Sequence, residues 1–372
     1  STEVLKIFPV LQKFQYIKAI FPGVILALVF CLFSQGINNV IAIEIFQNSK
    51  SPISTVMIAI LLGIIMGNAF TPRPGMMIGL DFTQSYILKL GIIFLGIRLS
   101  FGEFIKFGSI AIPLIIVCIV SVLILVKLLI KKVPISSRMS YLIAIGTSVC
   151  GATAIVATAP VINAKKTEVA YAIANITLFG VIAMLIYPYF AEWYFDDNSL
   201  KTGLFIGTAI HETSQVAAAG LIYDQQFNNP ETLNVATVTK LIRNTFLVIL
   251  IPLFAFLYNR GEIKDKNYSI LSIFPYFVLG FIGMIIVRNL GDQFFSIENS
   301  NYETFEIWKS IIGYIKILAT VFLTMAMAAV GISINLGDLK SMGYKPFVVG
   351  LIAAVTVGAI SLLYIETYTR LI

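Results

Sequence analysis

Long apolar runs that alternate with short polar stretches form the dominant pattern of this chain. Runs such as 112–126, 178–190 and 245–258 contain few polar residues. With their flanks they are long enough to cross a hydrocarbon core of about 30 Å. The same criterion predicts about eleven membrane segments, at 19–34, 53–70, 84–100, 108–127, 140–163, 169–190, 202–222, 237–258, 269–288, 309–333 and 346–366. The predicted fold is therefore an all-α polytopic membrane protein, with 1–372 as one integral membrane domain.

Composition agrees with this pattern. Of the 372 residues 58% are hydrophobic and 12% charged, whereas soluble globular domains carry about 25% charged residues. The net charge of +7 lies in short loops, where basic residues orient a membrane protein, so we expect no nucleic-acid partner. Cys31, Cys118 and Cys150 lie inside apolar segments without metal-ligand or disulfide spacing. We expect no metal and no cofactor, and the lipid bilayer as the surrounding partner.

Loop charges predict how the segments are oriented. The N-terminal arm and the loops 127–138 and 259–268 are basic, so the positive-inside rule puts them, with the N-terminus, in the cytoplasm. If every segment crossed, the lysine loop 163–168 would be external and the acidic loop 191–201 cytoplasmic, against this rule. Both conflicts disappear if the two segments next to these loops enter and leave on the same side. The charges therefore predict two re-entrant or broken segments, at 140–163 and 202–222.

Two decapeptides indicate an inverted repeat. LGIRLSFGEF (95–104) matches VGISINLGDL (330–339), pairing Gly96 with Gly331, Gly102 with Gly337 and Glu103 with Asp338. Each decapeptide ends one apolar segment and leads into the next, within hairpins near 84–127 and 309–366. Many secondary transporters are built from inverted repeats. The alternative is a recurring helix-end turn, with glycine as the cap and an acid at the next N-terminus.

The two predicted broken segments also resemble each other. GTSVCGATAIVAT (146–158) aligns without a gap to GTAIHETSQVAAA (207–219). A helix interrupted at membrane depth leaves backbone groups unpaired, which is tolerated only where protein or a water-filled cavity satisfies them. Gly151 would permit the first break, and inward-pointing half-helix N-termini would present N–H groups to an anion. The alternative is that these small residues only let membrane helices pack closely.

Adjacent His211 and Glu212 favour a functional site in the second motif. Ionisable groups at membrane depth are costly unless paired or hydrated, and they are candidates for function by default. A histidine beside a carboxylate can carry protons at cellular pH. The alternative is a structural His–Glu pair bonded to neighbouring backbone.

Two cations follow on a neighbouring segment. Lys240 and Arg243 are three residues apart and lie on one helical face. They would neutralise an oxyanion or pair with Glu212. Alternatively, they would extend to the external interface, as long basic side chains do.

Three motifs carry a resemblance to a known family. GTSVCGATAIVATAPVINAKKTEVAYAIANITLFGVIAMLIYPY (146–189), GTAIHETSQVAAAG (207–220) and ATVTKLIRN (236–244) resemble the YeiH-type family, catalogued as UPF0324 membrane proteins and predicted to be sulfate exporters. This family is distantly similar to the cation–proton antiporter and bile-acid symporter group, which implies inverted repeats and interrupted helices near the substrate. The family pattern has His-Asp where this chain has His211-Glu212, so the charge is kept and the side chain is one methylene longer.

The resemblance and the motifs together predict a secondary transporter, not an enzyme, in the bacterial inner membrane, with a homodimer as the expected assembly. Its expected substrate is sulfate, sulfite or a related sulfur oxyanion, exported from the cytoplasm with protons or sodium as the coupling ion. The predicted substrate-binding residues are Ser148, Cys150, Gly151, Thr153, Asn175, Thr213, Ser214 and Gln215, the proton-coupling residues His211 and Glu212, and the charge-balancing residues Lys240 and Arg243.

Two other functions stay open at this point. The first is a cation–proton antiporter, because one carboxylate with a neighbouring histidine could exchange protons for sodium. The second is an intramembrane enzyme with Cys150 as nucleophile and His211 as base, although the sequence has no nucleophile elbow and no metal-ligand pair.

Overall fold

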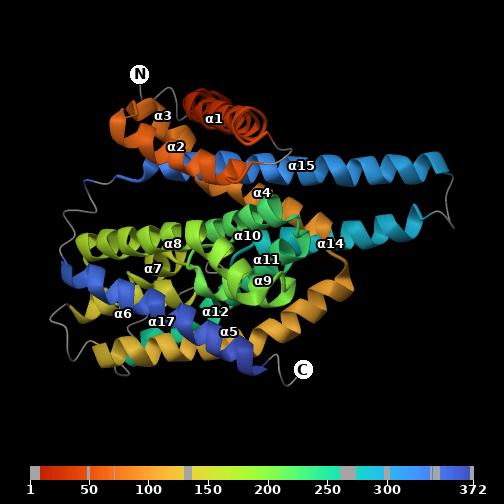
Figure 1. Ribbon diagram of the computed structural model, residues 1–372. Helices are drawn as coiled ribbons and strands as arrows, with labels where there is room; N and C mark the ends of the chain where they lie inside the picture. The colour runs from red at the N-terminus through yellow and green to blue at the C-terminus, as the bar shows by residue number, and fades with distance from the viewer. Residues whose placement is uncertain are drawn as a thin grey trace. The chain divides into compact units, whose positions relative to one another are not determined.

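The computed structural model describes residues 9–47, 51–70, 72–129, 136–259, 274–296, 302–335, 337 and 344–368. Most of the predicted basic loop residues, among them Lys131, Lys132 and Lys264, and the repeat residue Asp338 lie outside these ranges. The described residues form helices throughout (Figure 1). They belong to two compact units, Ser1–Leu95 with Glu306–Leu336 and Gly96–Phe305 with Gly337–Ile372.

Eight helices in the described ranges are long and apolar enough to cross a membrane, which confirms the all-α polytopic prediction. They are Tyr16–Ile45, Pro74–Arg98, Phe101–Leu128, Lys166–Phe195, Pro230–Phe254, Phe277–Phe294, Tyr302–Ser333 and Tyr344–Tyr368. The shorter apolar helix Thr55–Ala69 accounts for the segment predicted at 53–70. The segment predicted at 84–100 begins earlier than expected, at Pro74, because proline at the first helical position starts a helix at a site where its missing N–H costs nothing.

Unit 1 contains the first helices of the chain and one late helix. These elements are α1 (Pro9–Val40), η2 (Ile41–Ile45), α2 (Thr55–Ala69), α3 (Pro74–Phe82), η3 (Thr83–Ile87), α4 (Leu88–Leu95) and most of α15 (Tyr302–Ser333). Helices α1 and α3 touch through glycines: a Cβ atom on Gly23 would lie 2.6 Å from the Cα atom of Gly79. Such close backbone approach is typical of membrane helix pairs. Behind it, Ala27, Leu80 and Met325 belong to one buried apolar cluster.

Unit 2 contains all the predicted site residues. Its elements are η4 (Gly96–Arg98), α5 (Phe101–Leu129), α6 (Ser137–Ser148), α7 (Ala152–Thr158), α8 (Lys166–Phe195), α9 (Ser199–Ala209), α10 (Thr213–Phe227), α11 (Pro230–Thr245), α12 (Leu247–Asn259), α14 (Phe277–Phe294) and α17 (Tyr344–Tyr368). Helices α9, α10 and α11 lie side by side (Figure 1). The two decapeptides of the predicted repeat each contain a point where the chain passes between the units, after Leu95 and after Leu336. The inverted orientation of the two hairpins stays a prediction.

Candidate functional site

The first predicted broken segment is a helical hairpin with a break between its two helices. Helix α6 ends at Ser148 and α7 begins at Ala152. One carboxylate joins the two ends of the hairpin, because Glu168 accepts the Ser136 hydroxyl at 2.5 Å and the Lys165 backbone N–H at 2.8 Å. The chain therefore enters α6 and leaves α7 at the N-terminal end of α8.

The second predicted broken segment repeats this arrangement at the other end of α8. Helix α9 ends at Ala209 and α10 begins at Thr213. The Asn229 amide donates to Asp197 Oδ1 at 2.9 Å and to Ser199 Oγ at 3.0 Å, so α10 ends where α9 begins. Asp197 is the second residue after α8, a helix of 30 residues whose two ends are about 45 Å apart at ~1.5 Å per residue. The two hairpins thus start from opposite ends of one helix, as the loop charges predicted.

Lys240 on α11 brings the two breaks together. Its ammonium donates to Val149 O in the first break at 2.8 Å and to Ile210 O in the second at 3.1 Å, and also to His211 O. All three acceptors are carbonyl oxygens where a half-helix ends. Such oxygens carry the negative end of the helix dipole and have no partner within the helix.

Arg243 binds neighbouring carbonyl oxygens at the same two helix ends and shares Ile210 O with Lys240. Its Nε donates to Ser148 O at 2.7 Å and its Nη2 to Thr147 O, both on α6. Its Nη1 donates to Thr208 O at 2.6 Å and Ile210 O at 3.2 Å on the other hairpin. A planar guanidinium with five donors suits this division between two helix ends.

The alternative in which these cations extend to the interface is wrong, because the side chains of Lys240 and Arg243 are 0% exposed. The alternative of pairing with Glu212 is not found either, since no ion pair in the described part of the chain joins these residues. The cost of burying polar groups explains why these cations bind backbone. A cation beside uncapped carbonyl oxygens gives them hydrogen bonds, and its own donors are used at the same time.

The position of these cations along their helix fits membrane depth. Lys240 lies ten residues into the candidate spanning helix Pro230–Phe254, or about 15 Å from its start at ~1.5 Å per residue. That is about half the thickness of a hydrocarbon core. The breaks therefore meet near the middle of a candidate membrane span.

Glu212 lies on the other side of the breaks, where the second half-helices begin. It is the N-cap residue of α10, and its Oε1 accepts the Ala152 N–H of α7 at 3.4 Å and the Thr177 hydroxyl of α8 at 3.3 Å. Gly151 makes this approach feasible: its φ is +66°, and a Cβ atom there would lie 2.4 Å from Glu212 Cγ. The carboxylate of one hairpin thus caps the helix start of the other, where negative charge is favoured.

His211 is buried, with an exposed fraction of 1%. Its Nδ1 has no hydrogen-bond partner among the described residues, and its backbone oxygen is held by Lys240. The structural His–Glu pair that the sequence left open is therefore not found. A proton on this imidazole would add a third positive charge beside Lys240 and Arg243.

The remaining predicted residues near the breaks differ in their surroundings. Thr213 accepts the Asn244 amide at 2.9 Å, and the Gln215 amide donates to Thr177 O at 3.1 Å. Thr153 is exposed on α7. Three others are buried: Ser148, whose hydroxyl has no partner in the described ranges, Cys150 and Ser214.

Asn175 has another partner. Its amide donates to Pro346 O on α17 at 2.7 Å, so it joins α8 to α17. The α8 side chain that contacts Glu212 is Thr177. Neither Thr177 nor Asn244, which donates to Thr213, was among the predicted site residues. Asn244 follows Lys240 by one helical turn, and this spacing was the available signal.

No group of three or more His, Cys, Asp or Glu side chains in the described part of the chain could hold a metal ion. What the breaks offer is a carboxylate, hydroxyls, amides and two cations already bonded to backbone. This set is suited to binding and releasing a small ion.

Comparison with known proteins finds a matching family and several similar membrane proteins. The family described as Conserved hypothetical protein 698 matches residues 22–350. A UPF0324 membrane protein of Streptococcus agalactiae is 35% identical over 303 residues, 80% of this chain and 85% of its own. One of Fusobacterium nucleatum is 33% identical over 82% and 88%, and one of Clostridium tetani is 28% identical over 94% and 97%. No solved structure matches.

Proposed function

Because the chain belongs to the UPF0324 family of membrane proteins, we propose that it is a secondary transporter of small anions whose substrate site lies where the two helix breaks meet. The observation that carries the proposal is the joint capping of both breaks by Lys240 and Arg243. Broken helices that meet near the middle of a membrane span are the arrangement in which secondary transporters bind ions and substrates.

The charges at the breaks favour an anion. Lys240, Arg243 and the ionised Glu212 leave a formal charge of +1. In a site of low dielectric constant, an unbalanced charge attracts an ion of opposite sign strongly. When Glu212 is protonated the fixed charge is +2, which a dianion such as sulfate or sulfite balances. Export from the cytoplasm is the direction that the family resemblance implies.

We assign proton coupling to Glu212 rather than to His211. The Glu212 side chain is partly exposed, whereas His211 is buried beside two cations. Glu212 also occupies the helix start that an incoming anion would use. An anion and an ionised Glu212 therefore compete, and binding of the dianion takes up one proton.

A cation–proton antiporter is the second candidate. One specific observation favours it: the Glu212 carboxylate and the Thr177 hydroxyl offer oxygen ligands to a sodium ion at a partly exposed position. The enzyme alternative lacks such an observation, because no hydrogen bond among the described residues joins the buried Cys150 thiol to His211.

The test is uptake of radioactive sulfate, which stays a dianion at both pH values, into vesicles that contain the purified protein, at pH 6 and pH 8, for the wild type and for Glu212→Gln. The anion proposal predicts a lower KM for sulfate uptake at pH 6 than at pH 8 in the wild type, because binding takes up a proton. In Glu212→Gln it predicts a KM for sulfate uptake that no longer depends on pH. Glu366→Gln, at a carboxylate that pairs with Lys201, is the matched control and keeps wild-type behaviour. Sodium–proton exchange without anions, lost in Glu212→Gln, would refute the anion proposal in favour of the antiporter.

A further inference from the structure

The segment Gly96–Glu103, called the joint below, is where the chain passes into unit 2. Unit 1 ends at Leu95 and unit 2 begins at Gly96. Only Leu99 and Ser100 separate η4 from α5. The joint contains most of the first repeated decapeptide, a feature that the transport site at the helix breaks does not use.

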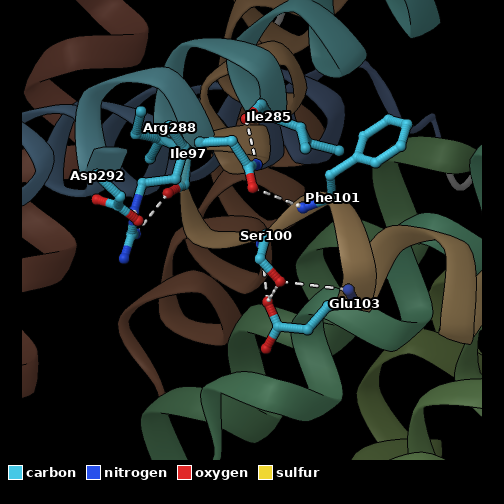
Figure 2. A network of polar contacts seen from close by, with 8 residues as sticks. Ile97, Ser100, Phe101, Glu103, Ile285, Arg288 and Asp292 are labelled. Carbon is cyan, nitrogen blue, oxygen red and sulfur yellow. Dashed lines mark hydrogen bonds and ion pairs between the residues drawn. The ribbon is translucent and has the colours of Figure 1, made fainter. Parts of the chain in front are cut away.

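Unit 2 attaches the joint to α14. Figure 2 shows Arg288 of α14 reaching the backbone oxygen of Ile97, with an Nη1–O distance of 2.9 Å. The side-chain oxygen of Asn289 accepts the Phe101 N–H at 3.3 Å. At Gly96 the backbones are so close that a Cβ atom would lie 2.4 Å from Phe281 O. Side chains and backbone of α14 therefore hold the joint at three points.

A reciprocal cap fixes the direction in which α5 leaves the joint. The Ser100 hydroxyl and N–H both donate to Glu103 Oε2, at 2.7 and 2.8 Å, and the Glu103 N–H donates back to Ser100 Oγ at 3.2 Å (Figure 2). This capping box satisfies backbone donors that the first helical turn leaves free. The joint is thus a defined structure and not a loose connection.

A second contact joins the joint to α10, the helix that has Glu212 at its start. Arg98 Nη1 pairs with Asp224 Oδ2 on α10 at 2.8 Å, and the two side chains are 11% and 19% exposed. Asp224 and the N-cap residue Glu212 lie on one continuous helix, about 16 Å apart between Thr213 and Asp224 at ~1.5 Å per residue. An uninterrupted helix of this length transmits a displacement of one end to the other.

We propose that Arg98 is a positioning residue for the site at the breaks: its ion pair with Asp224 fixes α10, and with it Glu212, to the joint through which the chain enters unit 2. Without the pair, α10 is held at this end by fewer contacts, and Glu212 is placed less accurately against Ala152. The transport readout of this inference rests on the proposed function.

The test compares Arg98→Gln, Asp224→Asn and the exchanged pair Arg98→Asp with Asp224→Arg. Glu366→Gln is the matched control, because it breaks another partly exposed ion pair of unit 2 that links α9 to α17. The first measurement is hydrogen exchange of the α10 amides in nanodiscs, which requires no substrate. Loss of a charge-assisted hydrogen bond predicts about tenfold faster exchange in the single variants, and near wild-type exchange in the exchanged pair.

The second measurement is sulfate uptake, for which the single variants are expected to lower kcat about tenfold with KM changed less than about twofold. The exchanged pair regains most of the rate. If α10 exchange is unchanged, or rises equally in Glu366→Gln, or is not restored by the exchanged pair, the inference is wrong. A single variant that does not fold leaves the exchanged pair as the decisive protein. If the wild type takes up no sulfate or sulfite while the exchange results hold, the proposed function fails and the positioning role stands.

Discussion

Replacing Arg243 with lysine tests whether backbone capping holds the two breaks together. The substitution keeps the positive charge and removes the planar fork. Arg243 now donates to two carbonyl oxygens of α6, through Nε and Nη2, and to two of the α9 hairpin, through Nη1. A lysine ammonium carries its donors on one nitrogen and cannot span all four carbonyl oxygens that three guanidinium nitrogens reach, so we expect about two of the four contacts to be lost.

The expected loss follows from the bonds that remain unmade. Two hydrogen bonds from a charged donor, at ~1.5 to 3 kcal/mol each, give a decrease of about 3 to 6 kcal/mol in the free energy of unfolding. The side chain is 0% exposed, so screening by solvent does not reduce this value. A water molecule that enters the break would restore one bond and move the result towards the lower end. The decrease is a large share of the ~5 to 15 kcal/mol that a folded domain has in total.

The assay is reversible unfolding in mixed detergent micelles, with Arg73→Lys as the matched control. Arg73 is exposed at the N-cap of α3, and its substitution is expected to change the free energy of unfolding by less than ~0.5 kcal/mol. A value for Arg243→Lys within about 0.5 kcal/mol of the wild type would show that the four carbonyl contacts do not hold the breaks, and the capping argument would be wrong.

Two further predictions concern the carboxylate side of the breaks. Gly151→Ala forces an L-residue to a φ of +66° and puts its Cβ atom against Glu212; we expect a loss of about 1 to 3 kcal/mol in stability and loss of pH-dependent anion binding. Stability is measured by thermal unfolding. The control is Gly283→Ala inside α14, where an added Cβ atom meets nothing within 4 Å; it is expected to keep anion binding and to keep or slightly raise stability, because alanine is the better helix former. Thr177→Val removes a hydrogen bond to Glu212 and is expected to change the pH dependence of sulfate binding, whereas Asn175→Ala, which loses a bond to α17, lowers thermal stability alone. Equal effects of these two variants on binding would contradict the assignment of Thr177 to the site.

The helices and the two breaks could be predicted from the sequence because each depends on a recognisable residue composition. Apolar length marks a membrane span, and an excess of small and hydroxylated residues marks an interrupted one. Loop charge then indicated that each hairpin returns to its starting side, and the contacts of Glu168 and Asn229 agree. The acceptors of Lys240 and Arg243 could not be predicted in this way, because every residue has a carbonyl oxygen and its availability depends on where a helix ends.

The role of Thr177 could not be predicted from the sequence either, which favoured Asn175 as the α8 residue of the site. Two residues apart on a helix means a rotation of about 200°, so only one of the two side chains can face a given neighbour. Which one does so depends on how α8 packs against α10 and α17. The faces of α8 differ little in hydrophobicity, so its sequence does not indicate which face is turned towards α10. Residue type favoured the amide, whereas packing turned the hydroxyl towards Glu212.

The two breaks are complementary rather than equivalent, and this explains why an internal repeat has only one carboxylate. At the aligned positions one motif has Cys150-Gly151 and the other His211-Glu212. A second glutamate in place of Gly151 would need a φ of +66° and would occupy the space where Glu212 Cγ now lies. It would also bring two carboxylates within a few Å of each other at membrane depth, where like charges repel strongly. The glycine of one half therefore makes room for the acid of the other, and under the proposed function a proton taken up at the breaks binds Glu212, which contacts both halves.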